Sequence, residues 1–216
     1  MTRADWYFDF ISPFSYLQFH ELRQLRELFE VRLRPVLLAG LLSHWGQLGP
    51  AEIAPKRSFI YRQVRWLARR RGVPLALPRA HPFNPLPLLR LAIHLGATEE
   101  AVERLFAFVW RDGKLPDDRA AWEQLLAELG VADAERAIGA EPVKQELRAN
   151  TEAAISAGVF GVPTLVVGEM LFWGDDSTQM ACDYAADPAK FLEDEARARA
   201  VPVGVMRKQP GARPGS

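Results

Sequence analysis

The sequence predicts an α/β fold in which a small β-sheet domain carries an inserted, all-helical domain. A short alternating strand at residues 6–10 is followed at once by a Ser-Pro helix start, and a later proline opens an apolar run that predicts a β-hairpin. Between them, residues 41–157 show the apolar spacing typical of helices. About half of the 216 residues are apolar, which is ample for a core of this kind.

The first strand leads directly into a helix that begins at Ser12. Serine is among the best N-cap residues and Pro13 suits the first helical position, so we expect a helix over 14–29 and a second strand at 31–37. The amino end of a helix carries partial positive charge and unpaired N–H groups, which suit an anion, including a thiolate supplied from outside. The alternative interpretation is that Ser12 only caps the helix.

The middle of the chain predicts a series of helices separated by glycine and proline breaks. We expect these helices at residues 54–71, 84–95, 99–110, 119–129 and 141–157. A ligand cleft would then form between the inserted domain and the sheet domain, because domain junctions commonly hold small-molecule sites.

The last part of the chain predicts a hairpin and a further helix. Pro163 opens the hairpin, which is permissible because proline is confined to strand starts and edges. Beyond the second strand, Asp175 or Asp176 is expected at the N-cap of a helix. Residues 201–216 are rich in Pro, Gly and Arg without periodicity and predict a flexible tail.

Three segments together carry a resemblance to a known family: Asp9 to Leu17, Phe160 to Thr164, and Trp173 to Asp176. In this order of elements they resemble the DsbA-like branch of the thioredoxin superfamily, and within it the kappa-class glutathione transferases and the bacterial 2-hydroxychromene-2-carboxylate isomerases. The resemblance implies a thioredoxin-like domain of residues 1–40 plus 158–200, an inserted helical domain of residues 41–157, and a tail of residues 201–216.

Cysteine usage excludes the dithiol redox chemistry of this fold. The only cysteine is Cys182, which lies far from the Ser12 turn and has no Cys-x-x-Cys partner, so we expect an inert, partly buried residue. A dithiol oxidoreductase needs two thiols at the active turn, and Ser12 and Ser15 both carry hydroxyl groups there.

The resemblance implies glutathione as the cofactor, with Ser12 donating a hydrogen bond to its thiolate. Lowering a thiol pKa from about 8.5 by roughly 1.5 to 2 units requires about 2–3 kcal/mol. A hydrogen bond to a charged group contributes about 1.5–3 kcal/mol and a helix end about 0.3–1 kcal/mol, so Ser12 can supply the shift. A nucleophilic role would need a neighbouring base, and His20 lies two turns along the same helix.

The resemblance also implies which residues hold glutathione. The backbone of Val162, before a cis Pro163, would pair with the cysteinyl part, and the segment 173–176 would bind the γ-glutamyl end. The implied set is Ser12, Pro13, Phe14, Gln47, Lys56, Val162, Pro163, Trp173, Gly174, Asp175 and Asp176. Gln47 stands where the family usually has asparagine. The alternatives are that both aspartates only cap a helix and that Lys56 is a surface residue.

A loop stiffened by two prolines carries His81 and Asn84. In the resembling isomerases the corresponding loop faces the second substrate, which implies that both residues bind it. His81 could orient a carboxylate or assist proton transfer, and the alternative is a histidine satisfied by nearby backbone. The four histidines show no metal-ligand spacing.

Composition limits the partners. The net charge is zero, which gives no electrostatic case for nucleic acid, and the run Arg69 to Arg71 is expected to be a solvated helix end. No apolar stretch is long enough to span a membrane and the N-terminus does not resemble a signal peptide, so we expect a cytoplasmic protein. Relatives are typically dimers, which implies a homodimer.

The function implied by the resemblance is a glutathione-dependent isomerase acting on 2-hydroxychromene-2-carboxylate or a related intermediate of aromatic compound degradation. The thiolate would add to an unsaturated, ring-opened substrate, allow rotation about the former double bond, and leave again by elimination. One alternative is a kappa-like transferase that conjugates glutathione to electrophiles. Another is a non-catalytic binding protein that keeps the fold without the chemistry.

Overall fold

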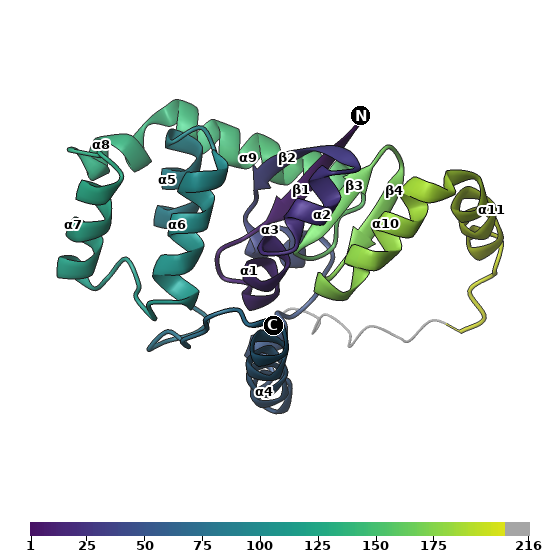
Figure 1. The fold of residues 1–216 in the computed structure, drawn as a ribbon, viewed down its shortest axis with the longest axis horizontal. Coiled ribbons are helices and arrows are strands. Elements are labelled where there is room, and N and C mark those ends of the chain that lie inside the picture. The colour runs from purple at the N-terminus through teal and green to yellow at the C-terminus, as the bar shows by residue number, and fades with distance from the viewer. Residues whose placement is uncertain (206–216) are drawn as a thin grey trace, which may run out of the picture. The chain divides into compact units, whose positions relative to one another are not determined.

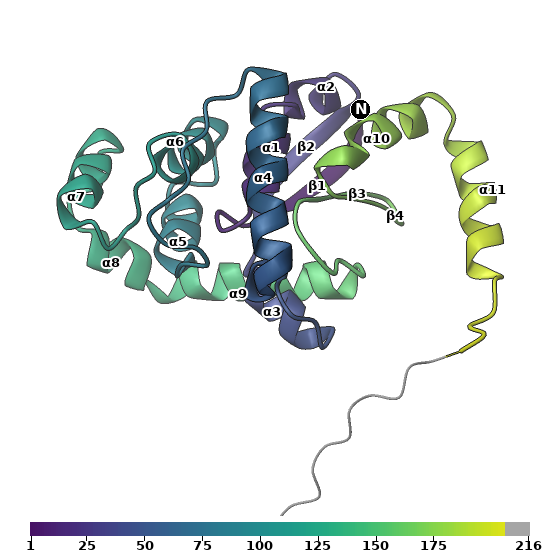
Figure 2. The same cartoon turned by 90° about the horizontal axis from the view of Figure 1, so that it is seen from below.

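The computed structural model describes residues 1–205, and its helices and strands are drawn in Figures 1 and 2. Residues 201–205 form no helix or strand and are exposed. The remaining part of the predicted tail, residues 206–216, lies outside the described residues. No helix in the described part is long and apolar enough to cross a membrane.

Four strands of the described chain form one sheet in the order β2-β1-β3-β4. Their bounds are Thr2–Phe8 for β1, Phe29–Pro35 for β2, Thr164–Val167 for β3 and Met170–Trp173 for β4. The central strand β1 runs parallel to β2 and antiparallel to β3, and β3 and β4 form the predicted hairpin. A parallel pair needs a crossover, and the helices that follow β1 provide it.

The helices occupy the rest of the described chain. They are α1 Pro13–Phe19, α2 Leu22–Arg26, α3 Leu38–His44, η1 Pro50–Glu52, α4 Ala54–Arg71, α5 Leu86–His94, α6 Glu99–Trp110, α7 Arg119–Glu128, α8 Ala134–Gly139, α9 Glu141–Ser156, η2 Asp175–Ser177, α10 Thr178–Ala186 and α11 Pro188–Arg199. The inserted helices return to the sheet through α9, which contacts β2, α3, α5 and α8.

Most of the expected helices are present, but the helix expected over residues 14–29 is wrong. The chain instead forms two short helices that end at Phe19 and Arg26, and β2 begins at Phe29, earlier than expected. Phe29 is buried and pairs with Thr2 of β1, so its apolar side chain serves the sheet. Phe29 has helical spacing from the apolar residues before it, but it is the first residue of a strand, so this spacing did not indicate a helix.

Aromatic packing joins the insertion to the sheet. Trp6 and Phe8 of β1 stack with ring centroids 4.7 Å apart, and Phe10 lies 4.7 Å from Phe106 of α6. The Trp110 indole N–H, at the end of α6, donates to the Phe10 carbonyl at 2.8 Å. This packing fixes the chain two residues before Ser12.

The opposite face of the sheet is also covered. Tyr7 of β1 belongs to a buried apolar cluster that includes Leu41 of α3 and Ala154 of α9. Tyr7 and Phe8 are neighbours in β1 and point to opposite faces of the sheet, and both are buried. Both faces of the sheet are therefore covered at β1.

Chain contacts divide the molecule into a large unit, Met1–Cys182, and a small C-terminal unit that begins at Asp183. In the small unit, Tyr184 packs edge-to-face on Phe191 with ring centroids 5.8 Å apart. Cys182 is half-buried in α10, at the end of the large unit. The division into domains 1–40 plus 158–200 and 41–157 stays a prediction.

Candidate functional site

Ser12 is the N-cap of α1, as expected, with Pro13 at the first helical position. Its Oγ accepts a hydrogen bond from the Ser15 N–H at 3.2 Å and donates to the Val162 carbonyl at 3.4 Å. Ser12 as a whole is 7% exposed. The bond to Val162 is longer than a normal O–H···O bond, so it is weak. A better acceptor placed beside Ser12 could therefore receive the Ser12 hydrogen bond in place of the Val162 carbonyl.

The turn before Ser12 is held by two side chains that the sequence interpretation did not assign to it. Asp9 is fully buried, and its carboxylate accepts the N–H groups of Ile11 at 3.1 Å and Leu38 at 2.9 Å. Burial raises the pKa of Asp9 to about 7, against the opposing effect of these N–H donors. The position of an aspartate directly after an apolar strand was the signal that could have identified it.

His81 holds the same turn from the other side. Its Nε2 lies 2.8 Å from the Ile11 carbonyl, which can only accept, so Nε2 carries the proton and donates. Its Nδ1 then accepts the Tyr61 O–H at 2.8 Å. Burial lowers the pKa of His81, and the charge of Arg57 lowers it further. Both ring nitrogens of a neutral His81 are therefore engaged within the protein.

The loop opposite Ser12 contains a cis peptide bond between Val162 and Pro163. The Val162 N–H has no hydrogen-bond partner within the described residues, and the Pro163 carbonyl accepts the Gly174 N–H at 2.9 Å. Phe160 and Trp173 lie with ring centroids 5.0 Å apart. These contacts connect the Val162 loop to the segment 173–176.

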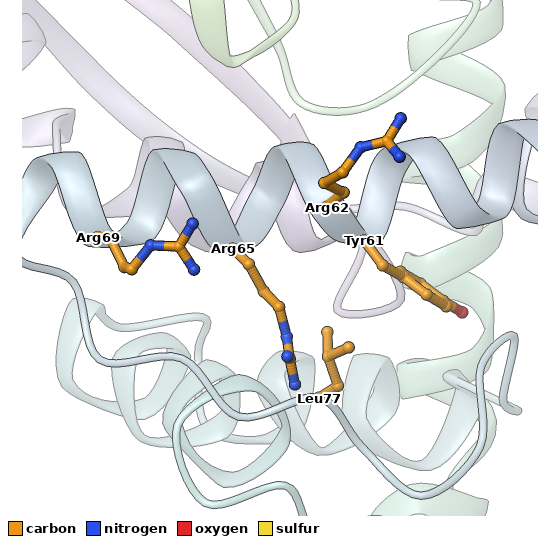
Figure 3. Close-up of a pocket in the computed structure, with 5 residues that line it drawn as sticks. All are labelled: Tyr61, Arg62, Arg65, Arg69 and Leu77. Carbon is orange, nitrogen blue, oxygen red and sulfur yellow. The ribbon is translucent and has the colours of Figure 1, made fainter.

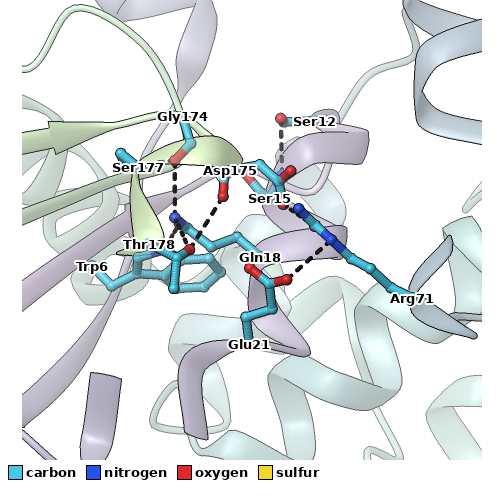
Figure 4. A network of polar contacts seen from close by, with 10 residues as sticks. All are labelled: Trp6, Ser12, Ser15, Gln18, Glu21, Arg71, Gly174, Asp175, Ser177 and Thr178. Atoms are coloured by element: carbon cyan, nitrogen blue, oxygen red, sulfur yellow. Dashed lines mark hydrogen bonds and ion pairs between the residues drawn. The ribbon is translucent and has the colours of Figure 1, made fainter. Parts of the chain in front are cut away.

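The expected N-cap role of the two aspartates is wrong, because Gly174, with a φ of 96°, is the N-cap of η2. Asp175 is instead buried and accepts an Arg71 N–H at 2.5 Å, while the Arg71 Nε lies 3.0 Å from Glu21 (Figure 4). The expectation of a solvated helix end is therefore wrong for Arg71. Burial raises the pKa of Asp175, and Arg71 opposes this shift. Asp176 is exposed.

A buried amide connects this segment to α1 (Figure 4). Gln18 accepts the Trp6 indole N–H at 2.7 Å and donates to the Gly174 carbonyl at 2.9 Å and to Thr178 at 3.2 Å. Sequence reasoning missed Gln18, and its signal was a polar residue on the apolar face of the first expected helix. The hydrogen bonds of Gln18 therefore connect β1, α1 and the segment that contains Gly174.

The contacts described so far do not involve the remaining candidate residues. Gln47 and Lys56 are exposed, and no contact in the described residues joins either to Ser12. Trp45, near Gln47, donates its indole N–H to the Val159 carbonyl at 2.9 Å and so lies against the loop before Val162.

Asn84 is exposed and accepts the Leu86 N–H at 3.1 Å. Phe14 lies in α1 beside Pro13 and is half-buried. A ligand contact at each of these residues stays a prediction.

Residues 3–185 match the family model of the DSBA-like thioredoxin domain, which spans most of the chain. The chain belongs to this family. The chain is 31% identical to a 2-hydroxychromene-2-carboxylate isomerase of Pseudomonas putida over 80% of its own length and 89% of that protein. It is 28% identical to glutathione S-transferase kappa 1 of Rattus norvegicus over 74% of its length and 78% of that protein.

A solved structure agrees with this assignment. A 2-hydroxychromene-2-carboxylate isomerase superposes with a TM-score of 0.72 at 25% identity, covering 90% of this chain and 98% of that one. The thioredoxin-like fold with inserted helices and the resemblance to these isomerases are thereby confirmed.

Proposed function

We propose that the protein is a glutathione-dependent isomerase of the 2-hydroxychromene-2-carboxylate type. The observation that carries this proposal is the Ser12 hydroxyl, placed at the amino end of α1 and facing the Val162 carbonyl 3.4 Å away. Relatives in the same family are named as such isomerases and as kappa-class glutathione transferases, which supports both the reaction and the cofactor.

In this proposal Ser12 stabilises the glutathione thiolate. The Ser15 N–H already donates to the Ser12 Oγ, which orients the hydroxyl and leaves its proton free to turn from Val162 to the sulfur. The helix end adds favourable charge. Together these interactions reach the roughly 2–3 kcal/mol that thiolate formation at neutral pH requires. The thiolate then adds to a carbon–carbon double bond, the resulting single bond rotates, and elimination restores the double bond and the free thiolate.

The peptide part of glutathione would lie along the Val162 loop. The free Val162 N–H can donate to the cysteinyl carbonyl as a neighbouring strand would. Asp175 is already paired with Arg71, whereas Asp176 is exposed at the same turn. We therefore assign the γ-glutamyl ammonium to Asp176 and a positioning role to Asp175.

His81 would act by positioning. Both its ring nitrogens are hydrogen-bonded, and its Nε2–H draws the Ile11 carbonyl toward itself. A carbonyl oxygen held in this way is kept from facing the thiolate next to Ser12. A direct contact between His81 and the second substrate stays a prediction.

The test is a calorimetric titration with reduced glutathione, with the thiolate absorption of the bound ligand followed in parallel. Wild type should bind and show the thiolate band, and Ser12→Ala should lose the band. Ser15→Ala is the matched control, because Ser15 lies on the same turn with a buried hydroxyl. Loss of the band in both variants, or no binding by wild type, would contradict the proposal.

A kappa-like transferase is the second candidate, favoured by the kappa-class relative. The two reactions differ in what happens to glutathione. Mass spectrometry of the product distinguishes them, because an isomerase releases an unmodified isomer and a transferase leaves glutathione covalently attached.

A further inference from the structure

The helix α4 concentrates positive charge in a chain whose net charge is zero. It carries one lysine and six arginines and no acidic residue. Arg71 is the last of these, and it is paired with Glu21 and Asp175. The other arginines of α4 form no ion pair with an acidic side chain within residues 1–205.

Two adjoining hollows lie along this helix. One, of about 420 Å³, is lined by Tyr61, Arg62, Arg65, Arg69 and Leu77 (Figure 3). The other, of about 440 Å³, shares Tyr61 and Leu77 and is lined also by Arg57, Pro78, Arg79, Ala80, His81 and Pro82. Each has the size of a small-molecule site. We call the two together the α4 groove.

The walls of the α4 groove combine cations with apolar surface. Arg57, Tyr61, Arg65 and Arg69 follow one another at intervals of four residues, so they lie on one face of the helix. Figure 3 shows Arg65 and Tyr61 extending from α4 toward the side where Leu77 lies. The phenol ring and the leucine side chain provide the apolar part. The Arg65 side chain extends toward the same side of α4, whereas the Arg62 guanidinium lies over the Phe59 ring, 5.6 Å from its centroid.

Such an arrangement is costly without a ligand. Like charges four residues apart on a helix destabilise it by about 0.2–0.5 kcal/mol per pair. Elsewhere in the described chain, arginines such as Arg104, Arg119 and Arg197 have acidic partners, whereas the exposed Arg136 and Arg148 form no ion pair with a described residue. What distinguishes α4 is that four arginines without an ion pair in the described chain, Arg57, Arg62, Arg65 and Arg69, lie on one helix and line the α4 groove. Arg79, which also lines the groove, is paired with Asp117.

We propose that the α4 groove binds an aromatic compound that carries two or more negatively charged groups. One carboxylate is satisfied by the bidentate fork of a single guanidinium, so a monoanion would leave most of these arginines unneutralised. The ring would pack between Tyr61 and Leu77 while its anionic groups reach arginines on α4. This proposal goes beyond the proposed isomerase, because the groove requires neither glutathione nor Ser12.

The groove is nevertheless connected to the Ser12 turn. Tyr61, which both hollows share, donates to His81, and His81 donates to the Ile11 carbonyl directly before Ser12. A ligand packed on Tyr61 would therefore lie two hydrogen bonds away from that turn.

The proposal is tested by calorimetric titration of the full chain, without glutathione, with three probes. Benzene-1,3,5-tricarboxylate has the ring and three charges, benzoate has the ring and one charge, and propane-1,2,3-tricarboxylate has three charges and no ring. The first should bind at least about tenfold more tightly than either of the others. Its affinity should fall with added salt.

Variants locate the site. Arg65→Gln should weaken the aromatic tricarboxylate about tenfold or more, since it removes a charged hydrogen-bond donor from the groove. Arg119→Gln removes the same charge from α7 and should leave the affinity unchanged. Equal affinity for the three probes, or no effect of Arg65→Gln, would overturn the proposal. A short single-stranded oligonucleotide serves as a competitor. If it displaces the bound tricarboxylate at a lower concentration than unbound tricarboxylate does, the surface binds nucleic acid and the proposal is overturned.

Discussion

Ser12 and Ser15 lie on the same turn of α1 and are both buried, yet their hydroxyl groups differ in hydrogen bonding. Ser12 caps the helix, whereas the Ser15 Oγ is buried and has no hydrogen-bond partner within residues 1–205. Loss of a serine cap costs about 1 kcal/mol, so Ser12→Ala should lower the free energy of unfolding by that amount. Ser15→Ala removes an unsatisfied buried group and should leave it within about 0.5 kcal/mol of wild type or raise it. Urea denaturation measures both, and an equal loss would contradict this prediction.

Asp9 should make stability depend on pH with a sign unusual for a carboxylate. Its pKa in the folded protein, about 7, lies above the ordinary 3.8 because burial disfavours the charged form. Folding therefore takes up a proton between these values, and the contribution of Asp9 to stability is complete below about pH 4 and is lost as the pH rises through about 7.

The measurement compares wild type with Asp9→Asn by urea denaturation from about pH 4 to about pH 8. The free energy of unfolding of wild type, relative to that of Asp9→Asn, should fall with rising pH by at most about 1.4 kcal/mol per pH unit. The amide that replaces the carboxyl in this variant cannot titrate, so changes in other groups cancel in the difference. A difference that is constant with pH, or that grows as the pH rises, would show that Asp9 is ionised in the folded protein throughout.

Among the elements, α4 is attached at its carboxyl end by Arg71, which bridges Glu21 and the buried Asp175. Arg71→Met should destabilise the protein by about 3 kcal/mol, because it leaves the Asp175 carboxylate buried without a partner. Adding Asp175→Asn should restore part of the loss, so the double variant should be less unstable than the sum of the two single ones. Arg70→Met is the control, since Arg70 is exposed and lies over Trp66. Strict additivity would contradict the bridge.

The elements also show what the sequence could predict. The helices α4 and α6 begin and end at the expected residues, because each is long, periodic and bounded by clear signals. The break after Phe19 is marked by neither glycine nor proline. The short helices α3 and α8 were not among the helices predicted individually, although residues 41–157 as a whole were expected to be helical. Short apolar segments fit a helix and a strand equally well, so their type is decided by packing that sequence periodicity does not contain.

In the molecule as a whole, the candidate site unites residues that are remote in sequence. Ser12 and Val162 are 150 positions apart, and no local pattern relates them. Only the resemblance to a family with this order of elements allowed Ser12 and Val162 to be predicted in one site. The connecting groups, Gln18, Arg71 and His81 with its Tyr61 partner, depend on the positions of three or more elements at once. Such groups could be identified individually as unusual polar residues, but not assigned to one site.

The division of the chain predicts which C-terminal segment the fold requires. The helix α11 contributes no buried residue, and the family model ends at residue 185. A chain ending at Asp187 should therefore keep its thermal midpoint within about 2 °C of the full chain. A chain ending at Ser177 also loses α10, in which Ala181 is buried and Thr178 accepts a hydrogen bond from Gln18, so its midpoint should fall by many degrees. Equal loss in both truncated chains would show that α11 is required for the stability of the large unit.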